Sequence, residues 1–223
     1  MESLSCERDK GGVKIKSMNT EQKVAKALLK IGAVGFMPDN PITFKSGIVS
    51  PIYIDNRKLP FHPNEWQIII QSFAEIIKRE KIKLDVIAGV EAAGIPHSAA
   101  LGFLLKIPSV FVRKKAKDHG TKRMVEGGSV LNKNVLLIED LVTTGDSSLR
   151  AVENLRKEGA KVKNCLVIVS YDFPEARDAF SKAKVKLHHI SSFPTIFDEV
   201  KKLGMIRGDK LKKVENWFKE HTK

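Results

Sequence analysis

The segment from Asn134 to Ser148 constrains the fold of this chain more than any other. It starts with an apolar run, Val135–Ile138, which is too short for a helix and consists of branched side chains, so we expect a buried parallel strand. Two acids and a hydroxyl-rich turn follow, and helical spacing of apolar residues begins at Ser147. A strand, a turn and a helix in this order predict an open α/β sheet, in which ligands bind at the carboxyl ends of the strands.

The turn carries the groups that hold a phosphate ester. Backbone N–H groups at the start of the helix would converge on one point, where a phosphate is favoured. Glu139 and Asp140 would accept hydrogen bonds from two neighbouring hydroxyl groups, as on a ribose. An acidic pair after a strand can also be ordinary surface, but the turn favours a ribose-phosphate site. Four side chains would add hydroxyl groups at the same point: Thr143, Thr144, Ser147 and Ser148.

This segment resembles the signature with which type I phosphoribosyltransferases bind phosphoribosyl pyrophosphate. A Walker-type phosphate loop is the main alternative, but its Gly-Lys-Ser/Thr tripeptide does not occur in the chain. The resemblance implies that the acids hold the ribose hydroxyls and that the turn cradles the 5′-phosphate. The contacts implied for this segment are Glu139, Asp140, Leu141, Val142, Thr143, Thr144, Gly145, Asp146 and Ser147.

Length and composition predict one globular domain. The chain has 223 residues and no Gly/Ser- or Pro-rich linker, so we expect a single domain at 19–223 after a polar, flexible extension at 1–18. No apolar run approaches the roughly 20 residues of a membrane span. Cys6 and Cys165 are isolated in the sequence and form no metal or redox pair, so we expect a cytoplasmic location.

The formal net charge of +13 raises nucleic acid as a partner. The lysines, however, are spread along the expected helices, as on solvated faces, and are not interleaved with exposed aromatic residues. We therefore do not expect a nucleic-acid surface, and we attribute part of the charge to polyanionic small substrates.

Strands and helices alternate after residue 60, which predicts a doubly wound parallel sheet. Before that point we expect a small hood at about 19–60, with a helix from about 20 to 31 and two short strands around Gly47. The expected helices of the main domain span 63–80, 95–105, 147–158 and 174–182. Its expected strands span 85–90, 109–112, 134–138, 162–170 and 186–190.

The segment 113–128 interrupts this alternation. It has no apolar periodicity, is dense in cations and ends in two glycines. A loop of this length inside a compact domain is usually functional or disordered. A solvated charged loop is the plain alternative, but beside a phosphate site the segment suits a lid that brings cations onto a pyrophosphate.

The loop 113–120 and the hood residues 44–55 together resemble the orotate phosphoribosyltransferase family, whereas purine members of the superfamily lack this pair. In the hood, the resemblance implies that Lys45 lies between base and pyrophosphate. It also implies that the backbone of Tyr53 and Ile54 faces orotate, which Thr143 could also touch. Taken alone, Lys45 could be an exposed hairpin lysine and Tyr53 a packing residue of the hood.

In the loop, the resemblance implies that Arg113, Lys117 and His119 bind pyrophosphate oxygens. It further implies a homodimer with shared sites, in which Lys114 and the loop 113–128 reach the neighbouring subunit. These cations would balance charge on the leaving group, and we name Lys117, His119 and Lys45 as catalytic.

Two positions depart from the pattern of some family members. Ala93 stands where they carry a lysine that binds pyrophosphate, and Tyr171–Phe173 stands where they carry an arginine that binds orotate. These departures concern single contacts rather than the activity. Ala92, Ala93 and Gly94 still suit a close backbone approach to pyrophosphate.

The implied reaction is displacement of pyrophosphate from C1 of phosphoribosyl pyrophosphate by N1 of orotate, which gives orotidine 5′-monophosphate for pyrimidine (UMP) synthesis. Mg²⁺ would be held mainly by substrate oxygens and water, with no direct protein ligand. We expect a monofunctional chain. Two alternatives remain: a phosphoribosyltransferase for another base, and a non-catalytic regulator that senses phosphoribosyl pyrophosphate.

Lys117→Ala is expected to lower kcat and kcat/KM by about a hundredfold, or roughly 3 kcal/mol, because one preorganised donor to the leaving group is lost. Steady-state kinetics with both substrates check this. A loss confined to KM would contradict a role in the transition state.

Overall fold

The computed structural model describes residues 19–44, 46–114 and 123–222. The expected extension at 1–18 lies outside the described residues, so the proposed division of the chain remains a prediction. Among the described residues, no helix combines the length and the apolar character that a membrane crossing requires.

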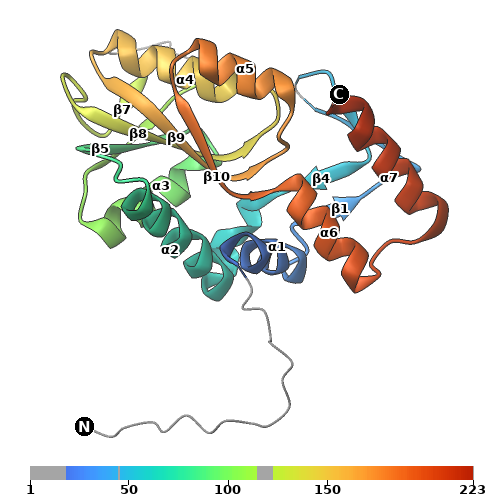
Figure 1. Cartoon of the computed structure of the whole chain (residues 1–223). Coiled ribbons are helices and arrows are strands. Elements are labelled where there is room, and N and C mark those ends of the chain that lie inside the picture. The colour runs from blue at the N-terminus through green and yellow to red at the C-terminus, as the bar shows by residue number, and fades with distance from the viewer. Residues whose placement is uncertain (1–18, 45, 115–122, 223) are drawn as a thin grey trace, which may run out of the picture.

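A six-stranded sheet forms the centre of the fold, and helices cover both of its faces (Figure 1). The strand order is β10-β9-β8-β5-β6-β7, and all neighbouring pairs are parallel except β6 and β7. This arrangement confirms the predicted α/β class and its parallel sheet. The strands are β5 (Val86–Val90), β6 (Ser109–Val112), β7 (Val125–Glu126), β8 (Asn134–Val142), β9 (Lys161–Ser170) and β10 (Lys186–Ser192).

Two layers of helices enclose this sheet, and a third group extends it at one end (Figure 1). The layer below the sheet in the figure is α1 (Thr20–Lys30), α2 (Pro63–Arg79) and α3 (Gly94–Leu105). The layer above it is α4 (Asp146–Lys157) and α5 (Pro174–Lys182). The end group is α6 (Phe193–Leu203) and α7 (Gly208–His221).

The hood consists of two small antiparallel pairs, followed by a 3-10 helix, η1 (Asn56–Phe61). β1 (Val34–Phe36) pairs with β4 (Ile52–Ile54), and β2 (Ile42–Thr43) pairs with β3 (Val49–Ser50). Of the two short strands expected around Gly47, the first contains β2 and the second contains β4, which pairs with β1 rather than with β2.

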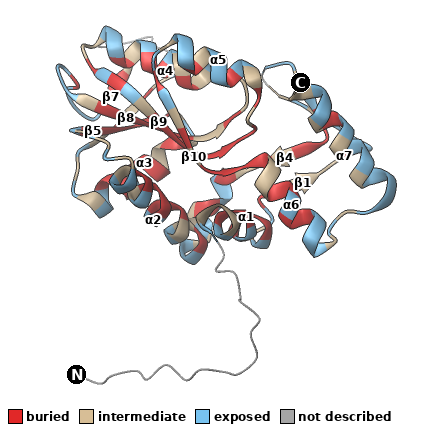
Figure 2. Ribbon diagram, in the orientation of Figure 1, coloured by how far each residue is buried: buried red, intermediate tan, exposed pale blue. Residues whose placement is uncertain are grey.

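Alternation along the central strands divides the core into two parts. In β8, Leu136 and Ile138 pack into the cluster that includes α1 and α2, whereas Val135 and Leu137 pack into the cluster that includes α4. Successive strand residues point to opposite faces, so a continuous apolar run is buried on both sides. Figure 2 shows this burial concentrated in the sheet strands.

The structure corrects two of the expected boundaries. The strand expected to end at Ile138 continues to Val142, because Glu139 and Leu141 remain paired with β9. The second half of the expected loop 113–128 is partly sheet, since buried Val125 pairs with Val112 as β7. Both segments looked irregular in sequence because charged residues interrupt or flank them.

His97 of α3 supplies a pH-dependent contribution to stability. It is fully buried, the indole nitrogen of Trp66 donates to its Nδ1 at 2.9 Å, and burial lowers its pKa to about 4 from 6.5. The imidazole of His97 binds a proton more readily in the unfolded chain than in the folded one. The contribution of neutral His97 to the free energy of unfolding is therefore fully present above pH 6.5 and is lost as the pH drops toward 4. We expect a loss of about 3 kcal/mol.

Urea unfolding at pH 7.5, 5.5 and 4.5 measures this loss. We expect His97→Gln to show a weaker dependence on pH over this range. Equal slopes for the variant and the unchanged protein would mean that other groups cause the acid sensitivity.

Candidate functional site

A polar cavity of about 220 Å³ lies at the carboxyl end of β8, where ligands bind in parallel sheets. The turn from β8 to α4 forms most of its wall. The lining residues are Ser46, Lys114, Leu141, Val142, Thr143, Thr144, Gly145, Asp146, Ser147 and Arg150. The structure therefore brings the expected phosphate-binding segment around one cavity.

Gly145 fixes the conformation of this turn. Its φ is +91°, in the left-handed region, and a Cβ built there would lie 2.8 Å from Cε2 of Phe180. Glycine is thus required both by the backbone and by the neighbouring ring. The helix α4 starts at the next residue, Asp146, without a side-chain cap, so its first N–H groups remain available to an anion in the cavity.

The acids lie in the last part of β8; neither lines the cavity itself, and Glu139 is linked to it through Ser147. Glu139 is 4% exposed, and its carboxylate accepts hydrogen bonds from Oγ of Ser147 at 3.3 Å and Oγ of Ser148 at 3.5 Å. We expected the hydroxyl of Ser148 to face a phosphate, but this residue is fully buried beneath Glu139. Ser148 therefore supports the acid instead, while Ser147 contacts Glu139 and also lines the cavity.

Burial strongly affects the charge of the two acids. Desolvation, with the adjacent Asp140 carboxyl, raises the pKa of Glu139 well above its usual value, and desolvation also raises the pKa of Asp140. The ammonium group of Lys114 opposes both shifts. A ligand that offers hydroxyl donors, or that binds together with a cation, would favour the charged carboxylates. It would thereby reduce the free-energy cost of burying their charge.

The hood is attached directly to the acidic pair. Asn56, which follows β4 and is fully buried, donates from Nδ2 to the carbonyl oxygen of Asp140 at 2.8 Å. Tyr53 and Ile54 of β4 lie just before it and pair with β1. Neither Tyr53 nor Ile54 lines the phosphate cavity. Their connection to the acidic pair is the nearby Asn56, which contacts Asp140.

The turn from β5 to α3 lies against β8. A Cβ on Gly94 would lie 2.6 Å from the carbonyl oxygen of Ile138, so only glycine allows this approach. The preceding Ala92 and Ala93 are held at the carboxyl end of β5, but they line neither this cavity nor the one beside it. The Glu91 carboxylate accepts from the N–H of Lys114 at 2.8 Å, which ties the turn to the start of the loop.

A second cavity, of about 280 Å³, adjoins the first and shares three of its residues: Lys114, Ser147 and Arg150. Arg113 lines it too, at 3.8 Å from the carboxylate of Glu126. Lys114 lines both cavities of its own chain, and its expected reach into a neighbouring subunit stays a prediction. Three expected catalytic residues lie outside the described residues: Lys45, Lys117 and His119.

Sequence reasoning missed Arg150 and Asn56. Arg150 follows Ser147 by three residues, which places both on one face of α4, so helical spacing could have identified it. Asn56 had no such signal, because its role depends on a contact with a strand 84 residues away.

Comparison with known proteins agrees with this geometry. A phosphoribosyl transferase domain matches residues 59–201, which include the sheet, the acidic pair and the phosphate turn. The fold and the site thus define a phosphoribosyltransferase of the type I class.

Comparison with individual proteins identifies the family within this class. An orotate phosphoribosyltransferase of Coxiella burnetii is 37% identical over 203 residues, 91% of this chain and 97% of that protein. The structure of orotate phosphoribosyltransferase from Aeropyrum pernix has a TM-score of 0.71 and 30% identity, over 82% of this chain and 99% of that one. That of Leishmania donovani UMP synthase has a TM-score of 0.80 and 27% identity, over 91% of this chain and 43% of that one. The chain belongs to the orotate phosphoribosyltransferase family.

Proposed function

We propose that this protein transfers the ribose 5-phosphate group of phosphoribosyl pyrophosphate to N1 of orotate, releasing pyrophosphate and forming orotidine 5′-monophosphate for UMP synthesis. The observation that carries the proposal is the cavity lined by the phosphate turn and the uncapped start of α4, where Ser147 both lines the cavity and donates to Glu139 of β8. A phosphate suits the helix start, and vicinal hydroxyls suit the carboxylates. We also propose that residues 19–223 form one domain.

In this proposal the described residues bind and orient the ribose phosphate. Thr143, Thr144 and the first N–H groups of α4 hold the 5′-phosphate, while Glu139 and Asp140 accept from the ribose hydroxyls. Lys114 and Arg150, which line both adjoining cavities, would lie beside the leaving group. Fixed cations at that position stabilise the charge that develops as the C1–O bond breaks.

Other residues carry roles that rest on the family pattern. We propose that Arg113, Lys117 and His119 complete the pyrophosphate contacts with the backbone of Ala92 and Ala93. Lys45 would lie beside the base, which the backbone of Tyr53 and Ile54 would contact. Ser46, the neighbour of Lys45, lines the cavity, which supports this placement of the hood turn.

We further propose that Mg²⁺ enters with the substrate. Among the described residues, no group of three or more His, Cys, Asp or Glu side chains could hold a metal. The carboxylates of Glu139 and Asp140 nevertheless suit a magnesium–substrate complex, because burial raises their pKa values and a nearby cation would favour the charged forms. When bound, the metal would neutralise part of the pyrophosphate charge.

The reaction is tested by following pyrophosphate release and orotate consumption together. The expected result is equal amounts of both, dependent on Mg²⁺ and on phosphoribosyl pyrophosphate. Release of pyrophosphate without loss of orotate would indicate hydrolysis and count against transfer.

Arg150→Gln is expected to raise the KM for phosphoribosyl pyrophosphate by about tenfold, the effect of one lost charge-assisted hydrogen bond. The orotate KM should change little, because Arg150 lines the two adjoining cavities, whereas Tyr53 and Ile54 of β4, the proposed orotate contacts, line neither. Initial rates over a matrix of both substrates separate the two effects.

Lys157→Gln is the matched control, since it removes one exposed cation from the other end of the same helix. It should leave both KM values unchanged. Equal effects of the two substitutions would mean that net charge, rather than a contact in the cavity, attracts the substrate.

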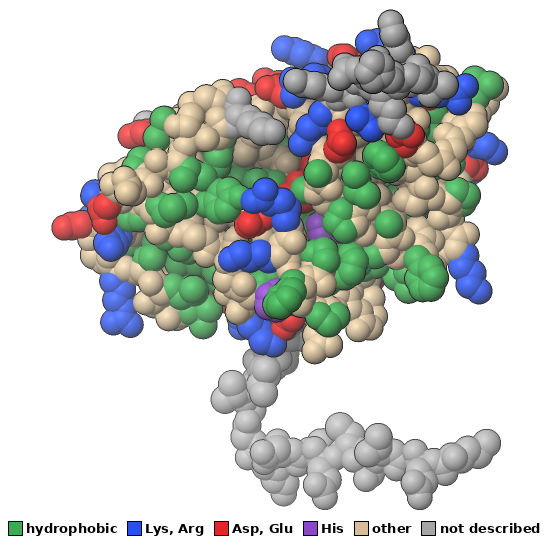
Figure 3. Space-filling model, turned by 180° about the vertical axis from the view of Figure 1, so that it is seen from behind, with side chains coloured by type: hydrophobic (Ala, Val, Ile, Leu, Met, Phe, Trp, Pro, Cys, Tyr) green, Lys and Arg blue, Asp and Glu red, His purple; other side chains and the backbone are tan. Residues whose placement is uncertain are grey.

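We also propose a homodimer with shared sites. Its support is an apolar groove of about 940 Å³ between α2 and α3, lined by Trp66, Ile107 and the largely exposed Phe103. Exposed apolar groups of this kind often mark protein contacts, and Figure 3 shows several such groups on one face.

We propose the cytoplasm as the location of the protein. The buried, free thiol of Cys165 suits this reducing compartment.

Mixing two inactive variants tests the shared site. If the loop acts across a two-fold interface, Lys117→Ala and Asp140→Asn subunits would form mixed dimers with one intact site. Random exchange should then restore roughly a quarter of the normal activity. Dimers that exchange subunits without regaining activity would place the loop over its own chain's site.

A further inference from the structure

A third cavity, also polar, lies at the other end of the central strands from the phosphoribosyl cavity. It has a volume of about 270 Å³ and forms where β8, β9 and β10 begin and α2 ends. The nine residues of β8 separate it from the phosphoribosyl cavity by roughly 25 Å, at the usual rise of a strand. A ligand here would not compete for the phosphoribosyl cavity.

Lysine is strongly enriched around this cavity, which we call the lysine cavity. Five of its twelve lining residues are lysines, whereas lysine and arginine together make up 39 of 223 residues in the chain. They come from the α2–β5 connection and from two strands, so the fold rather than one local run gathers them. The five are Lys81, Lys83, Lys161, Lys163 and Lys186.

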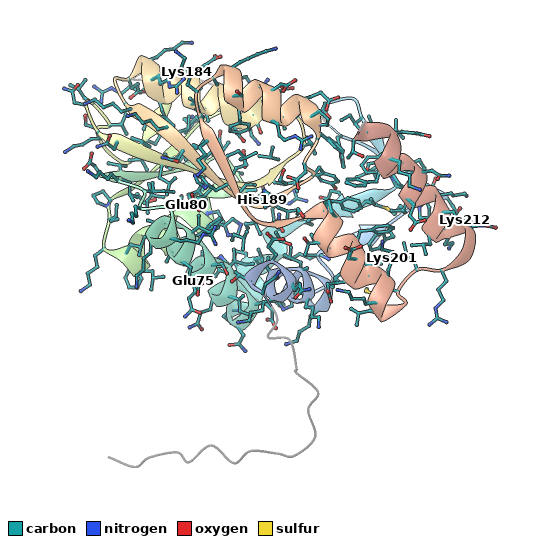
Figure 4. The ribbon with its side chains drawn as sticks, in the orientation of Figure 1. Glu75, Glu80, Lys184, His189, Lys201 and Lys212 are labelled. Atoms are coloured by element: carbon teal, nitrogen blue, oxygen red, sulfur yellow. The ribbon has the colours of Figure 1, made fainter. Side chains whose placement is uncertain are left out.

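The acids at this edge are already engaged. Glu80 bonds Nζ of Lys186 at 2.7 Å and Nε of Arg79 at 3.2 Å, and Figure 4 shows it at the end of α2. Asp85 accepts from the backbone and side chain of Asn134 at 2.7 and 2.9 Å. In the described part of the chain, the other four lysines of the cavity have no carboxylate within ion-pair distance.

A buried histidine forms part of the same wall. His188 is 8% exposed, and its Nε2 lies 3.0 Å from Oδ1 of Asn164, which also lines the cavity. Desolvation, together with the charge of Lys186, lowers the pKa of His188. Because Lys186 lowers and Glu80 raises the pKa of this imidazole, a charged ligand bound in the cavity would shift it too.

We propose that the lysine cavity binds a small anion with two or more negative charges, of the class of pyrophosphate and sugar phosphates. Its volume is close to the 220 Å³ of the phosphoribosyl cavity, which favours a compact ligand over a polymer. Lysine ammonium groups bind phosphate as point charges and hold it without a fixed orientation. Asn134 and Asn164 also line the cavity and place neutral amide groups beside the lysines.

Pyrophosphate titration, followed by the ring NMR signals of His188 at constant ionic strength, tests the proposal. Loss of the signal in His188→Gln assigns it. We expect a saturable shift and a raised pKa of His188, because an anion favours the imidazolium form. The double substitution Lys83→Gln/Lys163→Gln should weaken this binding by about tenfold or more and leave turnover unchanged.

Lys212→Gln/Lys219→Gln is the matched control, because it removes two exposed cations from the distant helix α7 (Figure 4). It should leave the titration of His188 unaltered. No shift, a shift that follows ionic strength alone, or equal binding by the Lys83/Lys163 variant would overturn the proposal. A shift of the His188 signal with single-stranded DNA but not with pyrophosphate would also overturn it.

Discussion

Glu139→Gln is expected to lower kcat/KM by roughly a hundredfold to a thousandfold while making the unliganded protein more stable. The activity falls because a neutral amide binds the ribose hydroxyls less strongly than a carboxylate when charge develops at C1. Stability rises because the folded chain keeps this carboxyl 4% exposed beside Asp140, an unfavourable place for charge. Removing it should stabilise the fold by about 1–3 kcal/mol.

The size of this stability effect depends on pH. Because the folded protein raises the pKa of Glu139, the cost of burial is absent below the ordinary carboxyl pKa of 4.5 and grows as the pH rises above it. Denaturant unfolding of the two proteins should therefore coincide near pH 4 and diverge toward pH 8. Glu153→Gln, an exposed carboxylate on α4, is the control and should change neither activity nor stability. Loss of both properties in Glu139→Gln would make the acid a structural group.

Gly89→Ala is expected to destabilise the protein by roughly 3 kcal/mol or more, the range of severe overpacking. A Cβ at this position in β5 would lie 2.3 Å from Oγ of Ser98 and 2.7 Å from the carbonyl oxygen of Gly94. Because Gly94 itself contacts β8 closely, the turn cannot move aside without disturbing the acidic pair. Activity should fall with stability.

Thermal unfolding and kinetics of three variants check this reasoning. Gly128→Ala is the matched control, since its Cβ would meet only Cγ1 of Val110 at 3.7 Å, an ordinary contact. Adding Ser98→Ala to Gly89→Ala should not restore stability, because the clash with the Gly94 backbone remains. Full rescue by the double substitution would show that the serine hydroxyl, rather than the close backbone approach, sets the limit.

The segment around β8 shows which parts of this fold can be predicted from the sequence. The apolar run, the hydroxyl-rich turn and the helical spacing after Ser147 together predicted strand, phosphate turn and helix. The strand's true end was missed, because residues such as Glu139 and Asp140 look like the start of a turn. Pairing with β9 decides that boundary, and this pairing is a long-range contact.

In the candidate site, too, contiguous residues could be predicted from the sequence, whereas long-range contacts could not. The turn residues were predictable because they are contiguous, and Arg150 follows them at helical spacing. Asn56 and the buried orientation of Ser148 depend on how distant segments meet. The lysine cavity was hidden for this reason too: its cations are scattered in sequence and gather only where parallel strands begin together.

Turnover with a panel of bases tests the central claim most directly. The protein is incubated with phosphoribosyl pyrophosphate, Mg²⁺ and, in parallel, orotate, uracil, adenine or hypoxanthine, and pyrophosphate release and base consumption are followed. We predict turnover with orotate alone. Turnover only with another base would contradict the assigned role of the hood, and none with any base would favour a phosphoribosyl pyrophosphate sensor.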